Sequence, residues 1–514
     1  MNERDRAQRQ FVVKIAEELR VGAIDRRQFI RAAGLAGFAF ASSKYLSGCV
    51  PAQPKVPLAP DRVGSIGKPI ADSGRMTEQQ RFLKDVGGQF QGTKIKVLSE
   101  DTSPSLVISR MMKEEFTPLT GIEVDWEIVP LDQVLAKTVQ DSLHGANGGQ
   151  GQHDIFYWDQ AWLGRFAHES IHLDELQDKK ELAYPDYRFD DFLQPLVDAT
   201  ASYRGEIVGV PFDIPIFIMM YRKDIFEELN LVVPRTMSEY LSTVKVIHEA
   251  KSQQGVYGTV GQWKSGHYAL QSEASAWLWS HGGHHFDKDG QPDYVSDANI
   301  QGLQYMMELG QYMDPACTGW DWGGQFSAFA QGKAGLLISW SEFFPDFDDP
   351  SVSKIVGLVE ATDCPKEDAL LTKADCGFGE TPGISRQGGS CLALSRHAPN
   401  ADAAWIFMQW ATSADVTARA NAQGADTPTR KSNYSDPRVL EKNKPGIGTT
   451  RHFEVTKRAI ENRMGSSPHL PLWPVLGSEV NAVEYGKMTT KQQSIEETLK
   501  AIQEKTQKIL ADQA

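Results

Sequence analysis

KIKVL at residues 94–98, followed by the polar run from Ser99 to Ser105, is the stretch on which the fold depends. Its apolar residues predict a strand that ends in a loop. The next apolar residues recur at helical spacing: Ile108, Met111, Met112 and Phe116. Alternation at 124–128 then predicts a second strand, a helical segment follows, and DIFY at 154–157 predicts a third strand. Strand, helix, strand, helix, strand implies an α/β protein with a parallel sheet that helices cover on both faces.

The rest of the chain continues this alternation less regularly. A turn-rich stretch at 208–215 leads to an apolar strand at 216–221, and helix-rich sequence follows. An apolar stripe at 404–411 predicts another helix, and residues 487–510 are expected to form one charged amphipathic helix.

The first 49 residues contain the elements of an export signal in the order that export needs. Arg26 and Arg27 stand side by side, a weakly apolar segment follows at 32–40, and a small-residue site ends at Cys49. These elements resemble a twin-arginine signal joined to a lipobox. We therefore expect residues 1–48 to be a signal peptide, and the mature protein to be periplasmic or extracytoplasmic and lipid-anchored to a membrane through Cys49. A short soluble helix with a chance arginine pair is the alternative.

Acidic residues outnumber basic ones, most of all beyond this signal. The chain has 53 Lys and Arg against 67 Asp and Glu, a net charge of −14. Without residues 1–48, 44 basic and 62 acidic side chains remain. This excess repels phosphate backbones and argues against nucleic acid as a partner. With 41% hydrophobic residues among 514, the chain can bury a large core in two domains.

Cysteine and histidine usage bears on disulfides and metals. The cysteines after Cys49 are Cys317, Cys364, Cys376 and Cys391. An even number in an oxidising compartment favours disulfides, first Cys364 with Cys376 across a short acidic loop and then Cys317 with Cys391; four reduced buried thiols are the alternative. No two cysteines have the close spacing of a zinc site, and glycines separate the histidines of HGGHH at 281–285. We expect no metal and no cofactor.

Short motifs follow one another in a fixed order along the mature chain. They are DIFYW at 154–158 with Trp162; GVPFDIP at 209–215 leading to YRKDIF at 221–226; PRTMSE at 234–239; FAQGKAG at 329–335 with Trp340; Gly388-Gly389 before LALS at 392–395; AAW at 403–405; and YGK at 485–487. In this order they resemble the extracellular solute-binding proteins, family 1, of ABC importers, the group that includes maltose-binding protein.

The resemblance implies a two-lobed periplasmic-binding-protein fold of type II, whose lobes are joined by a hinge with several crossings. We expect these crossings near Asp213, Cys376 and Gly424. The expected parts are a tether at 49–88, lobe 1 at 89–212 plus 376–422, and lobe 2 at 213–375 plus 423–514. The insert at 346–376 has no role that the resemblance assigns. The resemblance to this family also implies a non-catalytic substrate-binding component, a monomer that works with the permease subunits of an ABC importer.

A carbohydrate or polyol is the ligand class that the residues of the expected cleft favour. Sugars need flat aromatic surfaces for their C–H faces and carboxylates, amides or arginine for their hydroxyls. Polar residues that follow the first and third strands stand where ligands bind in open α/β sheets. The expected ligand contacts are Asp101, Thr102, Ser103, Trp158, Asp159, Gln160, Trp162, Asp213, Trp263, Trp320, Trp322, Trp340, Gly388, Gly389 and Arg430.

Each expected contact has a plainer alternative. A tryptophan on an apolar stripe belongs to the core, as we expect for Trp405 and Trp410. The acids can cap loops, Gly388-Gly389 can form a tight turn, and Arg430 can pair with an acid. For the whole protein the alternatives are a secreted carbohydrate-active hydrolase, whose paired carboxylates the sequence alone does not place, and a receptor for an organic acid, amine or peptide.

Overall fold

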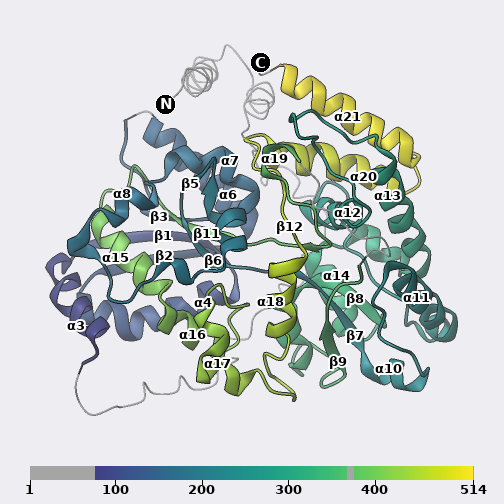
Figure 1. The fold of residues 1–514 in the computed structure, drawn as a ribbon, viewed down its shortest axis with the longest axis horizontal. Helices are drawn as coiled ribbons and strands as arrows, with labels where there is room; N and C mark the ends of the chain where they lie inside the picture. Colours follow the sequence, from purple (N-terminus) through teal and green to yellow (C-terminus); the bar gives the residue numbers. More distant parts are fainter. Residues whose placement is uncertain (1–75, 147, 367–375, 513–514) are drawn as a thin grey trace, which may run out of the picture.

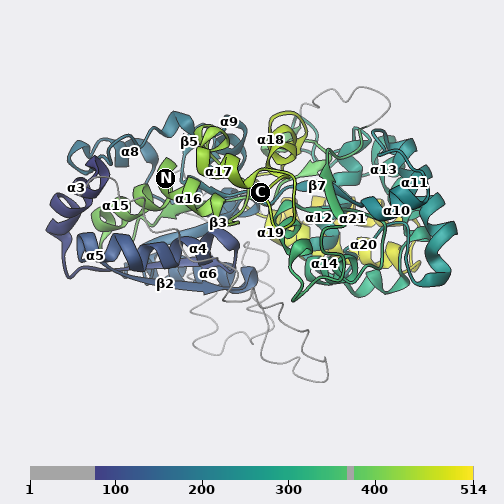
Figure 2. The same cartoon turned by 90° about the horizontal axis from the view of Figure 1, so that it is seen from below.

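Two sheets, each with its own helices, organise the chain (Figure 1). The computed structural model describes residues 76–146, 148–366 and 376–512. A five-stranded sheet has the order β2 (Glu123–Val129), β1 (Lys94–Glu100), β3 (Ile155–Asp159), β11 (Ser390–Leu394) and β6 (Val210–Asp213). A three-stranded sheet has the order β8 (Leu336–Trp340), β7 (Phe217–Arg222) and β9 (Val359–Thr362). We call the first sheet with its helices lobe 1 and the second lobe 2; they lie side by side (Figure 2).

The five-stranded sheet is mixed in direction. β1 pairs parallel to β2 and β3, as the alternation of strands and helices predicts. β11 lies antiparallel between β3 and β6, so the prediction of an all-parallel sheet is wrong. The chain enters β11 from lobe 2, and this strand therefore runs away from the junction between the lobes, whereas β1, β3 and β6 run toward it. Their carboxyl ends meet at that junction.

Helices cover the sheet of lobe 1 along the predicted apolar stripes. α4 (Ser103–Met111) continues through a wider turn at Met112–Phe116, and the stripe from Ile108 to Phe116 is buried. α15 (Ala401–Ala411) buries Trp405 and Trp410, which confirms their place in the core. The other helices on this side are α5 (Thr117–Thr120), α6 (Leu131–Ala146), α7 (Leu163–Phe166), α8 (Leu173–Gln177), α9 (Gln194–Leu196), α16 (Ala414–Ala422) and α17 (Pro437–Lys442).

Lobe 1 also contains residues that the sequence assigned to the tether. α3 (Glu78–Asp85) starts with a capping box, in which the Gln80 amide donates to the Thr77 hydroxyl at 3.1 Å and the Thr77 amide donates to the Gln80 side chain at 3.0 Å. Leu83 is fully buried, and the ring of Phe82 meets that of Tyr184 edge-on at 5.5 Å. The packed structure thus begins before residue 88, where the tether was expected to end.

Lobe 2 is richer in helices. They are α10 (Lys223–Glu228), α11 (Met237–Lys251), α12 (Tyr268–Ser280), α13 (Asp297–Leu309), α14 (Trp322–Ala330), α18 (Phe453–Asn462), α19 (Trp473–Val475), α20 (Ala482–Thr489) and α21 (Ile495–Ala511). The single helix predicted at 487–510 is wrong, because α20 ends at Thr489 and Ser494 caps the start of α21 with Glu497. The insert at 346–376 contributes β9, the third strand of the lobe 2 sheet.

The chain passes between the lobes in the neighbourhood of Asp213. The first passage runs from β6 to β7 through Ile214, whose amide donates to the carboxylate of Asp426 at 3.0 Å. The second leads from β10 (Ser385–Arg386), which pairs with β12 (Met464–Gly465), into β11. Since the Gly377 amide donates to the Phe286 carbonyl of lobe 2, the chain crosses after β10 and not near Cys376. Arg430 bonds to Thr412 and Arg438 to Asp415 in lobe 1, whereas Gly448 bonds to Asp348 in lobe 2, so the chain returns to lobe 2 after α17 and not near Gly424. The other domain boundaries stay predictions.

Among the described residues no disulfide forms, so the predicted disulfides Cys364–Cys376 and Cys317–Cys391 are absent from the structure. Cys391 lies on β11 of lobe 1, whereas Cys317 lies in a 3₁₀ turn at Pro315–Gly319 of lobe 2. The Cys364 thiol instead donates to the Phe217 carbonyl at 3.4 Å. Burial raises the pKa of Cys317 and of Cys364 to about 12, which keeps these thiols protonated.

Several predictions concern residues outside the described part. These are the signal at 1–48 with Arg26 and Arg27, the lipidation site Cys49 and the first part of the tether. Within the described ranges, none of the helices combines the length and the apolar character that a membrane crossing needs.

Candidate functional site

Five carboxylates gather where the two lobes meet. Glu100, Asp159 and Asp213 end β1, β3 and β6, Glu342 follows β8 by two residues, and Asp426 lies beside the passage at Ile214. We call these five residues the interlobe cluster. The clustering follows from topology, because three strands of one sheet and one strand of the other end at the same junction. Glu100 and Glu342 are partly exposed, while the other three are buried.

Hydroxyl groups tie the lobe 1 carboxylates together. The Tyr157 hydroxyl lies 3.0 Å from Glu100 Oε2 and 3.1 Å from Asp213 Oδ2, and it has one proton to donate to them. The Ser390 hydroxyl donates to Asp213 Oδ1 at 2.5 Å, and Thr102 also hydrogen-bonds this carboxylate. Asp213 is therefore held in place by three side chains from three strand ends.

Burial makes the buried carboxyls weak acids. It raises the pKa of Asp213 to about 6, although the hydrogen bonds from Ser390 and Tyr157 act in the opposite direction. The pKa of Asp159 is raised to about 7 by burial and that of Asp426 to about 7 by burial and the charge of Asp213. The pKa values of these three carboxyls therefore lie close to neutral pH.

Desolvation and the neighbouring acids raise the pKa values of the two partly exposed glutamates. Desolvation, followed by the charges of Asp213 and Asp159, raises the pKa of Glu100 well above its usual range. Desolvation, followed by Asp426 and Glu100, raises the pKa of Glu342 in the same way. Glu100 belongs to lobe 1 and Glu342 to lobe 2, so the carboxylates of the two lobes interact across the junction.

An arginine and aromatic rings line the lobe 2 side of the junction. The Arg386 guanidinium is buried, lies 5.2 Å from the ring of Tyr268 and 5.7 Å from that of Trp340, and donates to the Tyr268 hydroxyl at 3.0 Å. Its charge offsets part of the rise that burial causes in the pKa of Asp159. Trp340, the last residue of β8, also contacts the ring of Phe217 at 4.4 Å between centroids.

Four of the predicted contacts lie in this region. Thr102, Asp159 and Asp213 belong to the strand ends described above, and Trp340 contacts Arg386. Gln160 follows Asp159, is fully buried, and its amide N–H donates to the Gly389 carbonyl at 3.1 Å. Asp101 and Ser103 follow β1, the former exposed and the latter half-buried.

Three predicted contacts are interior residues, which corrects the sequence-based prediction. Trp158 stacks on Phe166 at 5.8 Å inside lobe 1, because its strand is buried on both faces. Trp263 is buried in lobe 2, where its indole donates to Glu273 at 2.8 Å.

Arg430 is fully buried and donates to the carbonyls of Thr412 and Arg188. Its guanidinium lies 3.9 Å from the ring of Phe192 and pairs with Asp191 at 3.4 Å. Arg430 thus pairs with an acid inside lobe 1, which is the alternative to ligand binding that its sequence position left open.

The other predicted tryptophans have mixed surroundings. Trp162 is buried in the turn after β3. Trp320 is half-buried with Lys333 5.9 Å above its ring. Trp322 is half-buried against the ring of His267 at 4.6 Å.

The glycine pair allows close packing of the chain and does not leave its N–H groups free for a ligand. The Gly388 amide donates to the Pro215 carbonyl at 2.8 Å and the Gly389 amide to the Gln387 side chain at 2.6 Å. A Cβ atom at Gly388 would lie 2.9 Å from the Trp340 ring, and one at Gly389 would lie 2.9 Å from the Asp213 carbonyl oxygen. The two glycines therefore allow close packing against Trp340 and the chain at 213–215, and their role as ligand contacts stays a prediction.

Sequence reasoning missed much of the cluster. Glu100 is the last residue of the first predicted strand, and Glu342 stands two residues after Trp340, so the strand-end argument used for Asp159 applies to both. Tyr157 lies inside the DIFYW motif. For Arg386 and Asp426 the sequence carries no comparable signal, because their positions depend on where the chain crosses between lobes.

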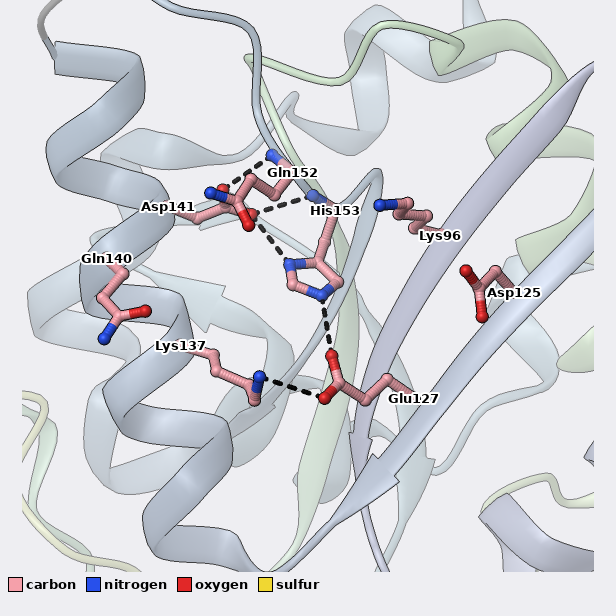
Figure 3. A pocket seen from close by; sticks show the side chains of 8 residues that line it. All are labelled: Lys96, Asp125, Glu127, Lys137, Gln140, Asp141, Gln152 and His153. Carbon is pink, nitrogen blue, oxygen red and sulfur yellow. Dashed lines mark hydrogen bonds and ion pairs between the residues drawn. The ribbon is translucent and has the colours of Figure 1, made fainter. Parts of the chain in front are cut away.

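A polar cavity of about 350 Å³ lies elsewhere on lobe 1, near the opposite ends of the strands (Figure 3). It is lined by Lys96, Asp125, Glu127, Lys137, Gln140, Asp141, Gln152 and His153. His153 lies 3.0 Å from Asp141 and 3.3 Å from Glu127, and Lys137 pairs with Glu127 at 3.0 Å. The charged groups of His153, Asp141, Glu127 and Lys137 therefore pair with one another, and we assign these residues a structural role.

No cluster of His, Cys, Asp or Glu suited to a metal ion occurs in the described ranges. Each histidine of HGGHH has a protein partner: His281 contacts the Trp277 carbonyl, His284 contacts Asp293, and His285 contacts Glu380. This segment therefore packs into lobe 2.

Comparison with known proteins agrees with this architecture. The model of the bacterial extracellular solute-binding protein family matches residues 107–418. The "Probable amino-acid ABC transporter periplasmic-binding protein y4oP" of Sinorhizobium fredii is 23% identical over 70% of this chain and 78% of its own length. The mannitol-binding protein of Pseudomonas aeruginosa is 24% identical over 62% of this chain and 73% of its own length.

Solved structures share the two-lobed fold. A solute-binding protein of an ABC transporter from Agrobacterium radiobacter, solved with ribitol, has 24% identity and a TM-score of 0.70, and the similarity covers 82% of this chain and 99% of that chain. The predicted type II periplasmic-binding-protein fold is thus confirmed. With the family model matching more than half of its length, the chain belongs to the bacterial extracellular solute-binding proteins and is a solute-binding component of an ABC transporter.

Proposed function

We propose that this chain captures a sugar or polyol at the interlobe cluster and delivers it, chemically unchanged, to the permease subunits of an importer. The observation that carries the proposal is that hydrogen-bond acceptors from both lobes meet there, Glu100 and Asp213 from one and Glu342 from the other. Ligand hydroxyls donate well to carboxylates, and the ring of Trp340 offers an apolar neighbour. The mannitol and ribitol in the names of similar proteins support the same ligand class.

A thermal-shift screen with monosaccharides, disaccharides and polyols tests this function. A ligand at 100 times its Kd stabilises the folded state by about 2.7 kcal/mol and raises the melting temperature. Calorimetry then gives the affinity, and the ligand should be recovered intact after long incubation. Cleaved product formed at a rate proportional to protein would instead support the hydrolase alternative.

We further propose that the mature protein is a monomer held at the membrane by acylated Cys49. The interlobe cluster is built from one chain, so a second copy is not needed to complete it. A twin-arginine route carries folded cargo, which suits a protein with two packed lobes.

Replacing both Arg26 and Arg27 with lysine should leave precursor in the cytoplasm, as measured by fractionation and immunoblotting. A Cys49→Ser variant serves as its counterpart, since it should be exported and lack the lipid. Normal amounts of mature lipoprotein from the double lysine variant would show that another route carries it.

A further inference from the structure

We propose that the ligand carries a protonated amine beside its hydroxyl groups, as in an amino sugar or an amino polyol. This inference rests on the proposed function and names the ligand class within it. It follows from the balance of charge at the junction, where the interlobe cluster supplies five carboxylates and Arg386 supplies one guanidinium.

The cluster contains more carboxyl groups than cationic side chains to pair with them. The charge of Arg386 stabilises the ionised form of Asp159. Within the described ranges, no lysine, arginine or histidine is hydrogen-bonded or ion-paired to Glu100, Asp213, Glu342 or Asp426. The Glu342 side chain has no hydrogen-bond partner among the described residues and is partly exposed, so its carboxylate can accept from a ligand.

Two buried side chains next to members of the cluster have polar atoms without partners. Gln160 is 0% exposed, and both its side-chain oxygen and its side-chain nitrogen lack a partner among the described residues. Its backbone amide donates to the Gly389 carbonyl, which places it beside the second passage between the lobes. The Nε of Arg386, 0% exposed, also lacks a partner in this part of the chain. Such groups are destabilising unless a ligand supplies donors and acceptors.

A cationic ligand pairs with these carboxylates better than a neutral ligand does. A neutral polyol leaves several desolvated carboxylates facing one another, and they then retain protons. An ammonium group offers three donors, and each charge-assisted hydrogen bond is about twice as strong as a neutral one. An anion would add to the repulsion. The amine is expected between Glu100 and Glu342, since these two partly exposed residues follow strand ends of opposite lobes and interact electrostatically.

Matched pairs of ligands test the charge directly. We would titrate the full-length protein by calorimetry with D-glucosamine, D-glucose and N-acetyl-D-glucosamine, and with 1-amino-1-deoxy-D-sorbitol and D-sorbitol. The amine of at least one pair should bind on the order of tenfold tighter than its neutral analogue, because one pKa unit of interaction between a carboxylate and a cation corresponds to a factor of ten. Titrations in two buffers of different ionisation enthalpy should also show proton release, and acetylation should abolish both effects.

Variants separate this charge effect from the proposed function. Glu342→Gln should reduce the ratio of amine to neutral affinity, and Glu100→Gln provides a second variant should the first fail to fold. Glu308→Gln is the matched control and should leave the ratio unchanged; it removes a carboxylate of α13 that pairs with Lys245 of α11. Equal or tighter binding of the neutral member of every pair that binds would overturn the amine inference and retain the function. No binding by any sugar, polyol or amino derivative would overturn both.

Discussion

Trp340 connects the strand end of lobe 2 with the arginine of the junction. Its ring contacts Phe217 and Arg386, so it both packs the lobe and supports the cationic side of the site. Trp340→Ala should weaken ligand binding by about 1 to 3 kcal/mol, through lost apolar contact and a less well held guanidinium. Calorimetry on the folded variant measures this, with Trp340→Phe retaining most of the affinity. Unchanged affinity in a folded Trp340→Ala protein would remove Trp340 from the site.

Asp426 allows a test of the buried charge by pH. Its folded pKa of about 7 exceeds the value near 3.9 of an unfolded aspartate, so the unfolded state binds fewer protons between these values. Its contribution to the free energy of unfolding therefore falls as the pH rises through this window, by up to about 1.4 kcal/mol per pH unit. Half-buried His267, whose pKa is lowered to about 4 by desolvation, acts in the opposite direction below pH about 6.5.

A substitution isolates the aspartate from the histidine. Asp426→Asn should flatten the decline of stability between pH 5 and 7 relative to the natural protein, as measured by urea unfolding without ligand. Asp125→Asn, at a carboxylate on β2 that pairs with Lys94 at 3.3 Å and has about half of its side chain exposed, serves as the control. Parallel pH curves for Asp426→Asn and the natural protein would contradict a buried, protonated Asp426.

At the scale of elements, α7 fixes how closely the lobes approach. A Cβ atom on Gly164 would lie 2.0 Å from the carbonyl oxygen of His469, a backbone atom of the segment that leads into α19. Backbone cannot rotate away as a side chain can, so Gly164→Ala should destabilise the protein by about 1 to 3 kcal/mol and weaken ligand binding. Thermal melting and calorimetry measure the two effects. Gly88→Ala is the control, since no atom lies within 4 Å of its Cβ position, and equal behaviour of the two variants would contradict the prediction.

Local sequence patterns determined some elements and not others. The strands at 94–98, 124–128 and 154–157 were predictable because local apolar residues define each of them; these residues are buried in the first and third strands and half-buried in the second. The direction of β11 was not, because it depends on a crossing whose position no local pattern records. The surroundings of Arg430 were not predictable for a similar reason, because its partners Arg188 and Asp191 lie more than 200 residues away in sequence. Within the interlobe cluster, the strand-end argument predicts a site position for residues such as Asp159 and Asp213. The position of Asp426 depends on how the lobes meet, which the sequence does not show.

At the scale of the whole molecule, the junction requires that the lobes work as a pair. Acceptors for a ligand come from both lobes, so a ligand that contacts Glu100 and Glu342 together binds the closed arrangement better than an open one. A shift of the closed population from 1% to 99% needs about 5.5 kcal/mol of differential binding, or roughly two to four hydrogen bonds to charged groups at about 1.5 to 3 kcal/mol each. The cluster has enough carboxylates on its two sides to provide them.

Small-angle X-ray scattering should therefore show a smaller radius of gyration with bound ligand than without it. Glu342→Gln should reduce this change at subsaturating ligand, because it removes an acceptor of lobe 2, while Glu308→Gln should not. The ligand should return from the complex intact, since binding to the closed state is the whole task of a receptor that presents its cargo to an importer. A radius that stays constant at saturating ligand, confirmed by calorimetry in the same sample, would contradict closure and leave the lobes as a rigid frame around a preformed site.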